Sequence, residues 1–169
     1  MVDNFNEKSD FIWSIADLLR GDYKQSEYQK VILPLTVLRR LDCVTERNKD
    51  EVLERYEQLQ EQGIENVAPS LKKAADAQVY NTSEYTFESL CNDPDDIAEN
   101  LQYYINQYDE ETKEIFEKFA FDHQIDRLAD ADLLYKVVRQ FAEIDLHPEE
   151  VANEEMGYIY EELIRKFNE

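Results

Sequence analysis

The sequence predicts an all-α fold: a bundle-like globular domain of about seven to nine helices, with no sheet. Glycine and proline are scarce, at 3 and 4 residues among 169, so the chain offers little β-turn chemistry. Residues that favour helices, such as glutamate, leucine, lysine and glutamine, are abundant. Hydrophobic residues make up 43% of the chain, which is enough to bury a core and argues against disorder.

The most apolar segment runs from Asp22 to Val44 and is expected to form the central helix, starting near Ser26 as N-cap. Its apolar side chains are so dense that such a helix would be buried on most sides. Pro34 lies inside the run. Because proline lacks a backbone N–H, it is expected to kink the helix or to mark a break in it.

Further helices are expected on both sides of this segment. The first covers about Glu7–Leu19 and stops at Arg20-Gly21. A more exposed helix falls within Thr45–Gln62 and ends at Gly63, and a short helix follows at about Leu71–Val79. Residues 80–86 are turn-like and are the best internal boundary in what is otherwise expected to be one helical domain over residues 1–169.

The second half is more regular. A short helix is expected at Phe87–Leu90, and later helices are expected to begin at Asp95 or Asp96, at Asp109, and at Asp130 or Asp132. His147-Pro148 is a break before the last helix. The side chains expected to face inward are Ile97, Leu101, Tyr104, Ile105, Tyr108, Ile115, Phe116, Phe119, Leu133, Leu134, Val137, Val138, Phe141, Met156, Ile159, Tyr160, Leu163, Ile164 and Phe167.

The formal net charge of −21 disfavours nonspecific binding to nucleic acids or membranes. The charge is unevenly spread: residues 1–85 carry 16 acids and 11 bases, a net −5, and residues 86–169 carry 23 acids and 7 bases, a net −16. Four basic residues interleave with the apolar run of the central helix, namely Lys24, Lys30, Arg39 and Arg40. They are candidates for contacts with DNA phosphates or a partner, although pairing with nearby acids is the more common role for such residues.

Catalytic and cofactor motifs are missing from the sequence. The three glycines are isolated, so neither a dinucleotide loop nor a phosphate loop is present. His123 and His147 lack metal-ligand spacing and are interpreted as surface or helix-end residues. Cys43 is interpreted as an inert core thiol and Cys91 lacks a neighbouring base, so neither is expected to be a nucleophile.

The N-terminus is polar and no apolar stretch approaches the ~20 residues of a membrane span, which predicts no membrane partner. Two distant cysteines indicate free thiols in a reducing compartment. A cytoplasmic location is therefore expected.

Two blocks of the chain resemble one family. The block FIWSIADLLRGDYKQSEYQKVILPLTVLRRLDCV resembles the opening of the modification (methyltransferase) subunit of type I restriction–modification systems. The block VANEEMGYIYEELIRKFNE resembles the join just before the catalytic domain of those subunits, and the order of the two blocks fits as well.

The resemblance implies a helical N-terminal domain of an S-adenosylmethionine-dependent, adenine-N6-specific DNA methyltransferase. The implied partners are DNA, a specificity subunit, a restriction subunit and a second copy of the modification subunit. The chain reaches Glu169 without the family's methyl-donor loop or its catalytic (Asn/Asp)-Pro-Pro-(Tyr/Phe) motif. No catalytic, cofactor-binding or metal-binding residue is therefore assigned, the catalytic domain is expected downstream of residue 169, and this chain alone is expected to be inactive.

Under this interpretation the domain helps to clamp DNA and to assemble with the specificity subunit. The less acidic first half would approach DNA, and the acidic second half would face solvent or a basic partner. Two alternatives remain open: an acidic DNA mimic, motivated by the net charge, and a purely scaffolding helical module with no DNA role.

Overall fold

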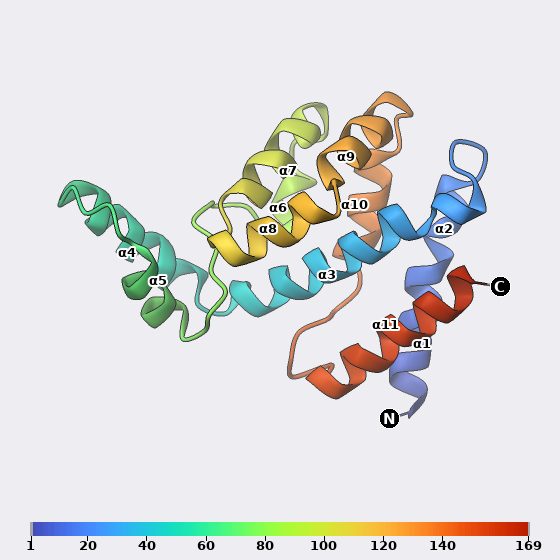
Figure 1. Cartoon of the computed structure of the whole chain (residues 1–169), viewed down its shortest axis with the longest axis horizontal. Coiled ribbons are helices and arrows are strands. Elements are labelled where there is room, and N and C mark those ends of the chain that lie inside the picture. The colour runs from blue at the N-terminus through green and yellow to red at the C-terminus, as the bar shows by residue number, and fades with distance from the viewer. Residues whose placement is uncertain (1, 169) are drawn as a thin grey trace.

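A computed structural model describes the backbone of residues 2–168 and the side chains of residues 6–168, and it confirms the all-α fold (Figure 1). The described residues form nine helices of eight or more residues and no strand beyond two isolated bridges. The α-helices are α1 (Val2–Ser14), α2 (Ala16–Leu19), α3 (Gln29–Glu46), α4 (Lys49–Glu61), α5 (Ala68–Ala75), α6 (Phe87–Leu90), α7 (Ile97–Asn106), α8 (Glu110–Lys118), α9 (Phe121–Asp130), α10 (Leu134–Ala142) and α11 (Asn153–Phe167), and the 3₁₀ turns are η1 (Gln25–Glu27) and η2 (Pro94–Asp96).

Helix α3 runs through the middle of the molecule and contacts α1, α9, α10 and α11 (Figure 1). Its side chains at Val31, Ile32, Leu35 and Leu38 are completely buried, as the apolar run predicts. The helix continues through Pro34, so the proline does not break it. It begins at Gln29 rather than near Ser26. The preceding turn, η1, is instead fixed by the Glu27 carboxylate, which accepts a hydrogen bond from the Lys24 backbone N–H.

The two ends of the chain meet where α1 and α11 pack side by side (Figure 1). The rings of Trp13 and Phe167 lie 5.1 Å apart between centroids. The ammonium of Lys166 lies 2.8 Å from a carboxylate oxygen of Asp10. These contacts make α11 part of the same core as the N-terminal helix.

Several boundaries differ from those expected. The first helix is interrupted at Ile15, and Ala120 takes a left-handed conformation, with φ of 51°, that separates α8 from the unforeseen helix α9. The expected helix start at Asp130 or Asp132 is therefore wrong: Asp130 is the last residue of α9, and the N-cap of α10 is Leu133. Helix α5 starts three residues early, because Pro69 fits the first turn of a helix.

Most of the expected inward side chains are buried, Tyr160 and Phe167 are half-buried, and three are exposed. Ile115, Phe119 and Ile164 are 43%, 38% and 40% exposed. Helix α8 ends before Ala120 and presents Phe116 to the core, which leaves Ile115 and Phe119 at its border. Asp96 and Asp109 occupy the N-cap positions that the sequence predicts. The Asp96 side chain makes no capping hydrogen bond, whereas the Asp109 carboxylate accepts one from the Thr112 N–H at 3.0 Å.

Helices α4 and α5 form a hairpin, here called the arm, that projects from the rest of the molecule (Figure 1). Gly63, with φ of 69°, ends α4 as expected. The arm has its own small core, separate from the main one, made by Val52, Leu59, Leu71, Ala75 and Tyr80. Among the described residues, no helix of the arm or of the body is long and apolar enough to cross a membrane.

Because the arm has its own core, we expect it to unfold locally and independently of the body. Leu71→Ala should destabilise the arm by about 2–5 kcal/mol, because Leu71 is fully buried there. Amide hydrogen exchange should accelerate in α4 and α5 and stay unchanged in α7, α9 and α10. The matched variant Leu101→Ala, in the main core, should accelerate exchange in the body. Equal acceleration everywhere in Leu71→Ala would show that arm and body open as one unit.

Candidate nucleic-acid interface

The four basic candidates fall into two groups with opposite environments. Lys24 and Lys30 are exposed, one just before η1 and the other in the first turn of α3. Arg40 is only 6% exposed and Arg39 is half-buried. Of the four candidates, only Lys24 and Lys30 are therefore surface cations.

The loop that carries Lys24 is held against α9 by Arg127. The Arg127 guanidinium donates to both Glu27 carboxylate oxygens, at 2.8 and 3.2 Å, and to the Asp22 carbonyl at 2.9 Å. It also lies 3.9 Å from the centroid of the Tyr23 ring, a cation–π contact. The hydrogen bonds from Arg127 lower the pKa of Glu27 to about 2. Arg127 is 100 residues from Glu27 in the chain, so no local sequence pattern indicates this anchor.

Arg39 is used inside the molecule. Its Nε donates to the Ile144 carbonyl at 2.9 Å and its Nη2 to the Ala142 carbonyl at 3.1 Å. Its Nη1 lies 2.8 Å from Asp42 Oδ2, and the guanidinium lies 5.6 Å from the centroid of the Phe87 ring. Each nitrogen of the guanidinium thus has a partner inside the molecule. These contacts fasten the segment after α10 to α3.

Arg40 fastens the same segment further along. Its Nη1 donates to the carbonyl of Leu146, at 2.7 Å, and to that of Val151, and its Nη2 donates to Asn153 Oδ1 at 2.9 Å. Backbone carbonyls in this connection would otherwise be buried without donors, so the arginine satisfies them. Arg39 and Arg40 therefore have structural roles in this fold, and a surface proposal rests on Lys24 and Lys30.

Asp42 completes a buried polar cluster on α3. Its Oδ1 accepts from the Tyr104 hydroxyl at 2.7 Å, and its Oδ2 accepts from Arg39 and, at 3.1 Å, from the Phe87 backbone N–H. Burial raises the pKa of Asp42, an effect that these hydrogen bonds and the Arg39 charge oppose. The hydroxyls of Tyr104 and Tyr108 lie 2.6 Å apart, and burial raises both of their pKa values well above 10.

Lys49 is a buried cation at the start of the arm. It is 8% exposed, its Nζ lies 3.5 Å from Asn81 Oδ1, and it sits 5.9 Å from the centroid of the Tyr104 ring. Burial lowers the pKa of Lys49 from 10.5 to about 8. The ammonium is thus stabilised by a carbonyl oxygen and a ring face but lacks a carboxylate within ion-pair distance among the described residues.

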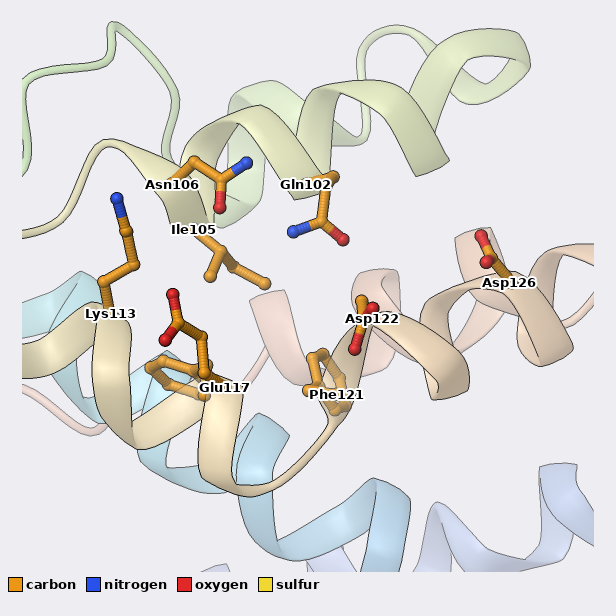
Figure 2. Close-up of a pocket in the computed structure, with 9 residues that line it drawn as sticks. Gln102, Ile105, Asn106, Lys113, Glu117, Phe121, Asp122 and Asp126 are labelled. Carbon is orange, nitrogen blue, oxygen red and sulfur yellow. The ribbon is translucent and has the colours of Figure 1, made fainter.

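A polar groove of about 640 Å³ lies where α7, α8 and α9 meet (Figure 2). The groove is lined by Gln102, Ile105, Asn106, Lys113, Phe116, Glu117, Phe121, Asp122 and Asp126. Lys113 lies 3.8 Å from Glu110, and the close-up shows its side chain beside Glu117. The lining lacks histidine, cysteine and serine, and no group of three or more potential metal ligands occurs in residues that the structure describes.

The buried Arg39–Asp42 pair predicts a large effect of removing one charge. Asp42→Asn should lower the free energy of unfolding by on the order of 3 kcal/mol, because the half-buried Arg39 loses its counter-charge. Urea unfolding measures this. The matched control is Asp17→Asn, which breaks the exposed Asp17–Arg20 pair at the same i, i+3 spacing and should cost less than about 1 kcal/mol. Equal effects in the two variants would contradict the role given to Asp42.

The lowered pKa of Lys49 predicts a pH-dependent stability difference. Above about pH 8 the folded chain holds Lys49 neutral, whereas the unfolded chain keeps its proton up to its ordinary pKa of 10.5. The unfolded state then binds more protons, so stability due to this group rises with pH. Relative to Lys49→Met, the wild type should gain roughly 2–3 kcal/mol between about pH 7 and about pH 10. Chemical denaturation of both proteins measures it, and a constant difference would refute the prediction.

One protein-family model matches most of the chain. Residues 8–141, which extend from α1 almost to the end of α10, match the family model described as the HsdM N-terminal domain. No curated protein matches the chain. The match includes both exposed lysines, the arginine pair of α3 and Arg127, and it covers well over half of the 169 residues. The chain therefore belongs to the HsdM N-terminal domain family, which is part of the methyltransferase subunit of type I restriction–modification systems.

Proposed function

We propose that this domain contacts DNA through Lys24 and Lys30 while it helps to assemble the modification subunit with the specificity subunit. The observation that carries the proposal is that both lysines are exposed and flank η1, the turn that Arg127 holds through Glu27. Neither lysine lies within ion-pair distance of a carboxylate among the described residues. Both ammonium groups are free to meet phosphate oxygens, which supply most of the sequence-independent affinity for DNA.

The Glu27–Arg127 pair supports the proposal because it fixes the loop without consuming the lysines. Arg127 pairs with the carboxylate of Glu27, which lies three residues from each lysine along the chain. The Tyr23 hydroxyl donates to Gln124 Oε1 at 2.9 Å and adds a second tie to α9. A loop held in this way loses little conformational freedom when it meets a phosphate backbone, which lowers the entropic cost of binding.

The remaining activities belong to the parent subunit in this proposal. That subunit would transfer a methyl group from S-adenosylmethionine to adenine N6, together with a specificity subunit, a restriction subunit and a second modification subunit. The described residues do not fit the methyl donor: Gly21 and Gly63 end helices, and Gly157 lies inside α11, so no glycine-rich turn is available to cradle it. We therefore expect no methyl transfer by this chain alone.

Charge reversal tests the DNA contact in the complete complex. Lys24→Glu and Lys30→Glu combined should raise the dissociation constant for duplex DNA about tenfold or more, because two phosphate contacts are lost. The slope of log affinity against log salt should fall by about two. Fluorescence anisotropy at several salt concentrations measures both values, and size-exclusion chromatography checks assembly.

The matched control is Lys136→Glu, which places the same charge change at an exposed position of α10. It should leave the salt slope unchanged. An unchanged slope in the double variant would contradict the DNA contact. If assembly were lost while the slope stayed constant, the lysines would face a protein partner, and a scaffolding role would replace the DNA role.

A further inference from the structure

A second cationic surface lies on the arm, far from Lys24 and Lys30. A groove of about 480 Å³ runs between α4 and α5 and is lined by Arg55, Pro69, Ser70, Lys73 and Ala74. Two of these five side chains are cationic and none is a carboxylate. The lining thus differs from the chain as a whole, which has 39 acidic residues against 18 basic ones.

The two cations of the groove are not neutralised within the molecule. Arg55 is exposed, and its Nη1 donates to the uncharged side chain of Gln58 at 3.1 Å. Lys73 is exposed in the last turn of α5. In the part of the chain that the structure describes, neither has a carboxylate within ion-pair distance. Both therefore keep their charge available for an external anion.

The groove is built on two helices that pack against each other. Along α4, Arg55 comes between the core residues Val52 and Leu59 in the sequence. Along α5, Lys73 comes between the core residues Leu71 and Ala75. The arm projects from the body in Figure 1, so a large ligand can approach it without meeting the other helices. The positions of the two cations are thus set by packing rather than by a mobile loop.

We propose that this arm groove binds the phosphodiester backbone of DNA, with Arg55 and Lys73 each contacting a phosphate and the Ser70 hydroxyl as an additional donor. This inference rests on the proposed function and adds a second contact region to it. A guanidinium matches phosphate oxygens in a bidentate manner, and an ammonium acts as a point charge. Recognition of a DNA backbone needs only such charges and donors.

The chemistry of the lining favours DNA over an acidic protein segment. Peptide-binding surfaces usually rely on aromatic or large aliphatic anchors. The lining of the arm groove contains only Pro69 and Ala74 as apolar residues, which are too small to supply such an anchor. An acidic segment would therefore gain little beyond screened ion pairs, whereas DNA offers a continuous row of phosphates.

The test is a charge-neutral double variant, Arg55→Gln with Lys73→Gln, in the complete complex of modification and specificity subunits. DNA affinity measured by anisotropy at several salt concentrations should fall several-fold to about tenfold, and the salt slope should fall by about two. The matched control is Lys72→Gln, because Lys72 is the next residue on the same helix but does not line the groove. Its salt slope should remain that of the wild type.

The outcomes separate this inference from the proposed function. A normal slope in the Arg55→Gln/Lys73→Gln variant, with a reduced slope in the Lys24→Glu/Lys30→Glu variant, overturns the arm site alone. Normal slopes in both overturn both contacts. Equal losses in Lys72→Gln and in the double variant would indicate a general charge effect and would also overturn the site. If circular dichroism showed the double variant to be misfolded, Lys73→Gln alone should still lower the slope by about one.

Discussion

The fold depends on the buried charges that α3 carries over its last turns. Asp42 accepts hydrogen bonds from α6 and α7, and Arg39 and Arg40 donate to the carbonyls of the connection between α10 and α11. Apolar packing attracts these elements to α3 but does not by itself fix their position along the helix. The directional hydrogen bonds do fix it, since each shift would leave a charge or a carbonyl buried without a partner.

This constraint explains which parts of the structure the sequence could predict. The apolar residues of α3, α7 and α10 recur at helical spacing, so their inward faces were predictable from local pattern alone. The inward orientation of Arg39 and Arg40 was not predictable in this way, because the carbonyls that they bind lie more than 100 residues away in sequence. Helix α9 was missed for a related reason: it is separated from α8 by Ala120 in a left-handed conformation, which sequence pattern reserves for glycine or asparagine.

The inward arginines also change how the charge imbalance should be interpreted. The sequence suggested a basic patch in the less acidic first half, yet Arg39, Arg40 and Lys49 are all turned toward the interior. The exposed surface of that half is therefore more acidic than its sequence implies. An acidic surface repels DNA in most relative orientations of the two molecules. Contact through a few fixed cations therefore favours one orientation of the domain on DNA over nonspecific binding.

The arm is joined at its base to the same buried cluster on α3. Lys49, the first residue of α4, lies beside the ring of Tyr104, and the hydroxyl of that tyrosine donates to Asp42. Asn81 accepts from Lys49 and donates to the Tyr104 carbonyl at 2.9 Å, while Asn48 donates to the Ala75 carbonyl across the arm. The base of the arm is therefore held by polar contacts that are buried or half-buried rather than by a free linker. Arg39, which pairs with Asp42, also donates to the carbonyls of Ala142 and Ile144, so the base of the arm and the segment after α10 are fastened to one buried polar cluster on α3.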